Sequence, residues 1–212
     1  MLKKMFISMV FMTMLVIGVS LYLFQEKVIG TFDQSNSRSG VLEQSFENED
    51  YFYFLSDKEI NRAIGKGTTS IILIEDYLLE SPEESLGTES HVAFAYIETP
   101  YLTTINIARN VFDHYGRIPS SQEVKQELFD QYLPIHIRFN ENKGYVYDLK
   151  MIQDEKEIEP FSTEVHGSGA MKTIYLNVGD LDFSMPATVI VEDSVDSSVN
   201  HQYEIDFENY IP

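Results

Sequence analysis

The chain has 212 residues, of which 43% are hydrophobic and 13% aromatic, enough to form a core and too many for a chain that is disordered throughout. A formal net charge of −19 disfavours binding to nucleic-acid phosphates and to anionic lipid headgroups. Cysteine is absent from the sequence, which excludes disulfides, thiolate zinc sites and cysteine nucleophiles.

The N-terminal residues predict a membrane-spanning helix. Lys3 and Lys4 precede residues 5–24, which carry no charge, and 20 helical residues span about 30 Å of hydrocarbon. Basic residues stay on the cytoplasmic side, so residues 1–4 are expected to be a cytoplasmic stub and the body of the chain to lie outside the cytoplasm. The alternatives are a cleaved signal peptide, with a loose cleavage site at residues 18–20, which would make the protein secreted, and a buried helix of the domain.

Residues 25–48 are predicted to be a flexible tether between the membrane and a folded domain at residues 49–212. The segment GTFDQSNSRSG at residues 30–40 is rich in serine, asparagine and glycine and has no apolar period.

The first elements of the predicted domain are a short helix and two strands. Ser56 and Glu59 form a capping box, which predicts a helix near residues 57–64, and Gly65 is a plausible C-terminal stop. Strands are predicted at residues 68–79 and 91–98, with a polar acidic loop between them.

Residues 107–128 have the outline of a DNA-binding helix-turn-helix. Apolar residues recur at helical spacing over residues 103–115 and again over residues 121–132, with Gly116 between the two predicted helices. The second helix starts at a capping box formed by Ser120 and Glu123, and Pro134 follows its predicted end.

A recognition helix needs basic and amide side chains in its exposed first turns. The second helix offers only Lys125 among acidic residues, so we predict no binding to nucleic acid. The two helices are instead expected to form an amphipathic hairpin whose Val124 and Leu128 face a sheet.

Beyond residue 134 the apolar period changes from 3.6 to 2. Strands are predicted over residues 135–139, 145–151, 172–178, 187–192 and 202–207. An irregular or edge strand is predicted around Pro160, because proline cannot donate to a sheet ladder.

This pattern predicts a mainly β fold with an α insertion (α+β). The fold is expected to be an antiparallel β-sandwich of about seven strands, immunoglobulin-like in general architecture, that carries the two-helix hairpin. It resembles many bacterial extracytoplasmic sandwich domains at the level of the fold alone.

Motifs that could support catalysis are weak in this sequence. Asp113 and His114 are adjacent on a predicted helix, so their side chains point about 100° apart and do not converge. Ser168 lies between two glycines, but the spacing is wrong for a nucleophile elbow and a strand follows it, so a flexible loop is expected. None of the histidines has the spacing of a metal motif, although a zinc site assembled only in the fold stays possible; they are His91, His114, His136, His166 and His201.

Acidic loops make calcium the most reasonable metal to consider. Asp180 and Asp182 lie in one loop, and Glu192, Asp193 and Asp196 lie in the next. The strand at about residues 187–191 separates the two loops by roughly 16 Å, so they cannot share one ion. We therefore assign no metal, cofactor or catalytic residue.

Aromatic side chains are the remaining signal of function. Residues 51–55 (YFYFL) and the pair Tyr145 and Tyr147 could form a recognition surface, although packing in the core or at a sheet edge is the expected role.

The sequence favours a membrane-anchored extracytoplasmic module that binds a protein partner and is not an enzyme. The acidic surface predicts that this partner is basic or apolar. The alternatives are a sensor or regulatory ectodomain coupled to another membrane protein, and an enzyme whose site is assembled from dispersed residues.

Overall fold

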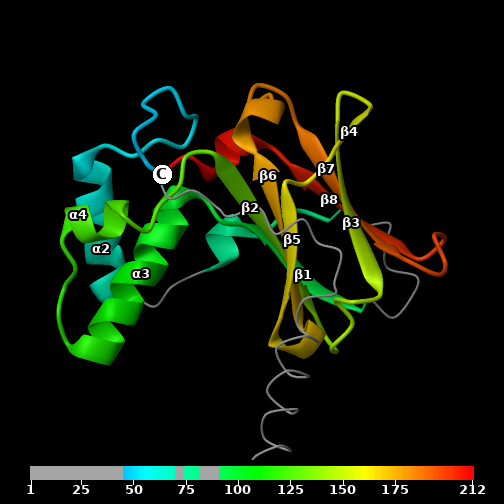
Figure 1. Cartoon of the computed structure of the whole chain (residues 1–212), viewed down its shortest axis with the longest axis horizontal. Helices are drawn as coiled ribbons and strands as arrows, with labels where there is room; N and C mark the ends of the chain where they lie inside the picture. The colour runs from blue at the N-terminus through cyan, green and yellow to red at the C-terminus, as the bar shows by residue number, and fades with distance from the viewer. Residues whose placement is uncertain (1–44, 70–73, 82–90) are drawn as a thin grey trace, which may run out of the picture. The chain divides into compact units, whose positions relative to one another are not determined.

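The computed structural model describes residues 45–69, 74–81 and 91–212. It has a mixed α+β fold with two antiparallel sheets of four strands each, and the helices α2, α3 and α4 lie together on one side of them (Figure 1). Within these ranges no helix is long and apolar enough to cross a membrane. The predicted span at residues 5–24 lies outside the described residues.

The strands of the first sheet have the order β1-β2-β6-β5. Their bounds are Val92–Ile97 (β1), Tyr132–Phe139 (β2), Met171–Asn177 (β6) and Ser162–His166 (β5). The strands of the second sheet have the order β4-β3-β7-β8. Their bounds are Lys156–Ile158 (β4), Tyr147–Gln153 (β3), Ala187–Asp193 (β7) and Asn200–Ile205 (β8).

One hydrophobic core is shared by the two sheets. Alternate residues of β3 are buried, as the period of 2 predicts, whereas β2 is buried at every residue except Arg138. The apolar side chains of both strands join one cluster. The rings of Phe139 in β2 and Tyr147 in β3 stack with their centroids 5.4 Å apart, which joins one sheet to the other. This β-rich arrangement is consistent with a β-sandwich.

The chain passes between the sheets three times along the β half. The connections β2–β3, β4–β5 and β6–β7 each join strands of different sheets. The strand predicted at residues 145–151 is present as β3, but it does not form a hairpin with the preceding β2, because β3 pairs with β4 and β7. Pro160 lies in the passage between β4 and β5, which are both edge strands, as predicted.

Helix α2 spans Asp57–Thr69 and is longer than the sequence predicts. It continues through Gly65 because Gly67 packs directly on the next helix, α3 (Pro100–Tyr115), where a Cβ atom would lie 2.5 Å from the carbonyl oxygen of Ile105. The strand predicted at residues 68–79 is wrong for residues 68–69, which end α2, and for Ile74–Tyr77, which form the 3-10 helix η1. Only its end pairs with a strand, where Leu78 forms an isolated bridge with Tyr96 of β1.

The second helix of the predicted hairpin is much shorter than expected. Helix α4 spans Ser121–Lys125, and the helix predicted over residues 121–132 is wrong beyond Lys125 because β2 begins at Tyr132. The capping box of Ser120 and Glu123 is present. Val124 and Leu128 are both buried, but α4 packs against α2 and α3, so the prediction that these two side chains face a sheet is confirmed only as to their burial.

Residues 45–48 belong to the folded domain and not to the predicted tether. Phe46 is buried and its ring stacks on Phe54 with centroids 5.2 Å apart. The buried carboxylate of Asp130 accepts hydrogen bonds from the backbone N–H groups of Glu47 at 2.6 Å and Asn48 at 2.8 Å. These contacts fix the start of the described chain to the segment between α4 and β2.

Short 3-10 turns complete the fold. They are Gly167–Gly169 (η3), Val178–Asp180 (η4) and Phe207–Tyr210 (η5).

Candidate functional site

Three loops meet at one end of the two sheets. They are residues 140–146 between β2 and β3, residues 167–170 between β5 and β6, and residues 194–199 between β7 and β8. The hairpin of β7 and β8 projects at the right of Figure 1. Large apolar side chains are exposed here: Tyr145 at 68%, Val146 at 43% and Val195 at 93%. We call these three residues, together with Asp148, Asp193 and Asp196, the sandwich-end surface.

Backbone contacts hold the first two loops together. The N–H of Gly144 donates to the carbonyl oxygen of Gly169 at 2.7 Å. Gly169 has a φ of +99°, and a Cβ atom there would lie 2.9 Å from the carbonyl oxygen of Asn142. Glycine is therefore required at residue 169, where the loops at residues 140–146 and 167–170 approach each other closely. The ring of Tyr145 also lies next to Gly169.

The third loop is joined to the first by Ser194. Its N–H donates to the carbonyl oxygen of Val146 at 2.9 Å, and its hydroxyl donates to Asp148 at 3.0 Å. These bonds bring Ser194, which precedes Val195, next to Val146, although the two segments are far apart in the chain. The three exposed apolar side chains thus come from two segments held in one arrangement.

The carboxylates of the sandwich-end surface are fixed by their own loops. Asp193 accepts from the N–H groups of Val195 at 2.8 Å and Asp196 at 3.1 Å. Asp196 accepts from the hydroxyl of Ser198 at 2.6 Å and from its N–H at 3.1 Å, which lowers the pKa of Asp196. Asp196 is therefore ionised at neutral pH, and its orientation is set before a partner arrives.

Cations compensate only part of this negative charge. Lys172 lies 3.7 Å from Asp148, and Lys150 pairs with the neighbouring Glu192 at 2.5 Å. Within residues 45–69, 74–81 and 91–212, no lysine or arginine forms an ion pair with Asp193 or Asp196. The arrangement is an apolar surface bordered by carboxylates that are available to an external cation.

The structure separates the aromatic residues that the sequence singled out. Tyr147 is 1% exposed and lies in the core, as expected, whereas Tyr145 is exposed, so the alternative of a recognition surface formed by the pair is wrong. Within residues 51–55, Tyr51, Tyr53 and Leu55 are buried, and Phe52 stacks on Phe183 with centroids 4.9 Å apart. That segment therefore packs in the core.

The other predicted motifs do not converge on a reactive group. Asp113 is 3.8 Å from Arg109, and His114 contacts the carbonyl oxygen of Asn110 at 2.9 Å, both at the exposed end of α3. Ser168 is exposed in η3 with a φ of +57°. Asp180 and Asp182 precede β7 whereas Glu192 and Asp193 end it, so the acidic loops lie at opposite ends of that strand.

His136 takes part in a polar network that the sequence did not reveal. Strand register aligns Tyr96, His136 and Thr173 across β1, β2 and β6. The Nε2 atom of His136 lies 2.6 Å from Glu98, and its Nδ1 atom lies 2.9 Å from the hydroxyl of Thr173. Thr173 is 0% exposed, so no substrate reaches its hydroxyl, and the network links the start of α3 to the sheet.

The other histidines are dispersed. His201 is buried, and burial with the nearby His91 lowers its pKa. His91 contacts Lys143 at 3.0 Å, and His166 pairs with Glu164 at 3.3 Å. Among the described residues, no group of three or more histidine, aspartate or glutamate side chains is placed to hold a metal ion.

Comparison with known proteins finds no matching protein-family model, no matching curated protein and no matching solved structure. The functional argument therefore rests on the geometry of the chain itself.

Sequence reasoning missed the sandwich-end surface because its parts are far apart in the chain. The exposed Val195 and the acidic loop around it were visible in the sequence, but their contact with residues 145–148 depends on the pairing of β3 with β7. Strand pairing of that kind does not follow from a hydrophobic period.

Proposed function

We propose that the protein is a membrane-anchored extracytoplasmic module that binds a protein partner and has no catalytic activity of its own. In this proposal the sandwich, immunoglobulin-like in general architecture, is a scaffold that presents the sandwich-end surface. The observation that carries the proposal is the exposure of Tyr145, Val146 and Val195 on two loops that hydrogen bonds join, together with the oriented carboxylates of Asp193 and Asp196.

The chemistry of this surface defines the partner. Adjacent exposed apolar side chains are typical of interaction sites, and tyrosine contributes apolar area with a polar tip. Asp193 and Asp196 attract lysine or arginine, so the partner carries basic side chains around an apolar centre. Electrostatic attraction of this kind raises the rate of association more than it raises the affinity.

Site-specific photo-crosslinking in intact cells tests the proposal. A photoreactive amino acid at Val195 of the full-length chain should give a discrete protein adduct. The same group at Lys156, which is 80% exposed on β4 and follows the opposite end of β3, should not. Adduct yield should fall as salt is raised, because exposed charges are screened. Equal labelling from both positions, or no adduct at Val195, contradicts a specific site at the sandwich end.

Charge and apolar contacts are separated by two sets of variants. Asp193→Asn with Asp196→Asn retains oxygen acceptors for the loop hydrogen bonds but removes two charges, and it should reduce the dependence of binding on salt. Tyr145→Ser with Val195→Ser should reduce the adduct yield at all salt concentrations. Turnover of a substrate that a single histidine or carboxylate substitution abolishes would show that the protein is an enzyme instead.

A further inference from the structure

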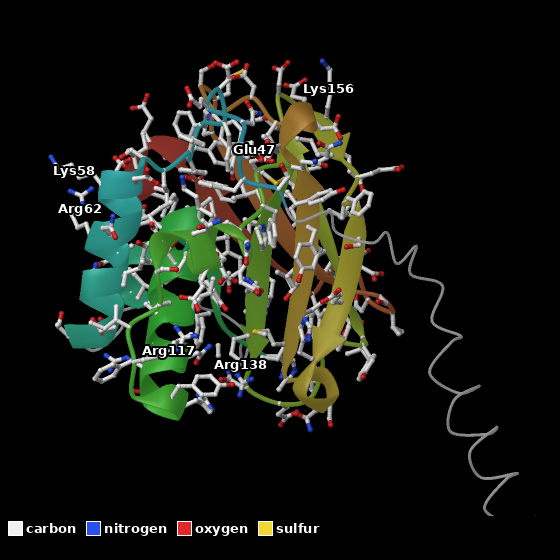
Figure 2. All side chains as sticks on the ribbon, turned by 60° about the vertical axis from the view of Figure 1, so that its left-hand side comes forward. Glu47, Lys58, Arg62, Arg117, Arg138 and Lys156 are labelled. Carbon is white, nitrogen blue, oxygen red and sulfur yellow. The ribbon has the colours of Figure 1, made fainter. Side chains whose placement is uncertain are left out.

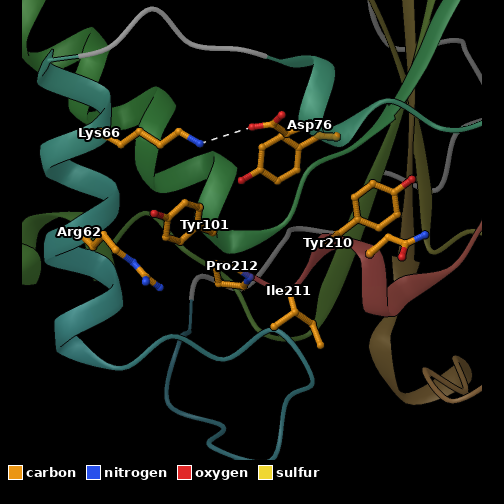
Figure 3. A pocket seen from close by; sticks show the side chains of 9 residues that line it. Arg62, Lys66, Asp76, Tyr101, Tyr210, Ile211 and Pro212 are labelled. Atoms are coloured by element: carbon orange, nitrogen blue, oxygen red, sulfur yellow. Dashed lines mark ion pairs between the residues drawn. The ribbon is translucent and has the colours of Figure 1, made fainter.

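A pocket that contains two cationic side chains, in contrast to the acidic sandwich-end surface, lies on the helical side of the domain. Its volume is about 250 Å³, and it is formed by α2, η1, the start of α3 and the segment that follows β8 (Figure 3). Two cations, three tyrosines and the apolar residues Ile211 and Pro212 contribute most of its walls.

The cations come from one face of α2. Arg62 and Lys66 are four residues apart, so both side chains project from the same side of the helix, as Figure 3 shows. Lys66 lies 3.5 Å from Asp76, and the guanidinium of Arg62 lies 5.8 Å from the ring centroid of Tyr101. Within the part of the chain that the structure describes, no carboxylate forms an ion pair with Arg62.

The charged side chains that line the pocket favour a ligand with a single negative charge. Among the side chains that line the pocket, Arg62 and Lys66 contribute two positive charges and Asp76 contributes one negative charge, so the side-chain charge is +1. A monoanion balances this charge, whereas a dianionic phosphate would face the carboxylate of Asp76 uncompensated. The planar guanidinium of Arg62 also matches the two oxygens of a carboxylate.

The tyrosines supply aromatic walls and neutral donors. Tyr77, Tyr101 and Tyr210 are all less than 10% exposed, so their rings are fixed in place. Burial raises the pKa of Tyr77 and, with the charges of Glu80 and Asp206, raises that of Tyr210 to about 12. The hydroxyl of Tyr210 donates to the carbonyl oxygen of Leu78 at 3.1 Å, which fixes this ring against η1.

From these observations we infer that the pocket binds a small organic monocarboxylate with a flat apolar body. The carboxylate contacts Arg62 and Lys66, and the apolar body lies between the tyrosine rings and Ile211. A volume of about 250 Å³ suits a molecule smaller than a drug-sized ligand. This site is separate from the sandwich-end surface and does not depend on the function proposed there.

Ligand-observed NMR with the full chain in zwitterionic detergent tests the inference with three probes of similar shape. Benzoate should bind saturably to the pocket. Benzamide, which has the same body without the charge, should bind about tenfold more weakly or not at all, since a charge-assisted contact is lost. Phenyl phosphate near pH 8, where it is a dianion, should bind more weakly than benzoate.

Variants on one helix assign the binding to the pocket. Arg62→Met keeps an apolar side chain over Tyr101 and should weaken benzoate binding by about tenfold. Lys58→Met is the matched control, because Lys58 also projects from α2 but does not line the pocket (Figure 2), and it should leave binding unchanged.

Three outcomes overturn the inference. They are the absence of saturable benzoate binding to the wild-type chain, equal loss of binding in Arg62→Met and Lys58→Met, and binding of phenyl phosphate that is tighter than that of benzoate. A far-ultraviolet circular dichroism spectrum and melting temperature equal to those of the wild type show that Arg62→Met is folded, so a loss of binding reports on the site.

Discussion

The sandwich-end surface and the helical pocket differ in the sign of their charge and in how that charge is held. Asp193 and Asp196 are oriented by backbone N–H groups and a serine hydroxyl of their own loop. Arg62 and Lys66 are placed instead by a helix, an aromatic ring and one carboxylate from η1. The net charge of −19 has the same sign as the charge of the sandwich-end surface, but it gives no indication of the cationic side chains in the pocket. Overall charge therefore predicts the average partner of a chain but not the ligand of a particular cavity.

The strongest test of this comparison is to loosen the helical layer. Leu128 is 1% exposed within the shared core, so Leu128→Ala should lower the free energy of unfolding by about 2–5 kcal/mol. Ile118→Ala, at a residue that is 61% exposed, should change it by less than about 0.5 kcal/mol. Urea denaturation followed by circular dichroism measures both. A loss below about 0.5 kcal/mol for Leu128→Ala would show that the helices are not docked as described.

The next test removes the polar link between α3 and the first sheet. Glu98 lies between β1 and α3 and accepts hydrogen bonds from His136, Thr103 and Asn106. Glu98→Ala should cost about 2–3 kcal/mol, somewhat less than a fully buried pair because its side chain is 20% exposed. Glu127→Ala, at an exposed carboxylate, should have little effect and is the control.

The contribution of Glu98 should depend on pH. Burial raises the pKa of Glu98, but the hydrogen bonds and charge of His136, with the bonds from Asn106 and Thr103, lower it further than burial raises it. Since the folded pKa is below the unfolded value of about 4.3, the stabilisation is complete above that value and is lost as the pH falls through the folded pKa. The difference between wild type and Glu98→Ala should therefore shrink below about pH 4. A difference that stays constant down to pH 3 would contradict this role.

A matched pair of glycines on α2 tests how closely that helix lies to α3. Gly67→Ala should destabilise the fold by about 1–3 kcal/mol, since its Cβ atom would meet backbone atoms of Ile105. Gly65→Ala has nothing within 4 Å and should stabilise the helix by about 0.5–1 kcal/mol. Thermal denaturation should thus shift in opposite directions for the two variants, and shifts of the same sign would show that α2 is not packed through Gly67.

The smallest expected effect on folding comes from the sandwich-end surface. Asp193→Asn with Asp196→Asn should leave the midpoint of urea denaturation nearly unchanged, because Asp196 is exposed and both side chains keep an oxygen acceptor for the loop. Benzoate binding at the pocket should also be unchanged. A large loss of either property would show that the two regions are not independent.

Elements that show a local pattern of apolar residues or a capping box could be predicted from the sequence. The pairing of strands, and the features that depend on it, could not. Alternation of apolar and polar residues located β2 and β3, and apolar segments bounded by polar loops and turns located β1, β6, β7 and β8. The capping boxes at Ser56 and Ser120 located the starts of α2 and α4. Tyr132 was assigned to a helix because it continues the spacing of Val124 and Leu128, but its pairing with Asn177 in β6 places it in a strand.

Neither candidate site could be derived from the sequence. The sandwich-end surface needs the register between β3 and β7, which places Tyr147 opposite Asp193. The pocket needs residues 209–212 to return to α2, more than 140 positions earlier in the chain (209 − 66 = 143). Long-range contacts of this kind carry no signature in the composition of either segment.

The contacts of Asp130 have a mechanical consequence. A tension applied at Ser45 acts first on the two hydrogen bonds that join Glu47 and Asn48 to this carboxylate, and on the bond from the N–H of Asp130 to the carbonyl oxygen of Ser45 at 2.8 Å. Asp130 is followed directly by β2, a central strand that pairs with β1 and β6. A pull on Ser45 is therefore passed to an interior strand, where many hydrogen bonds share the load, and not to the edge strands β4 and β5.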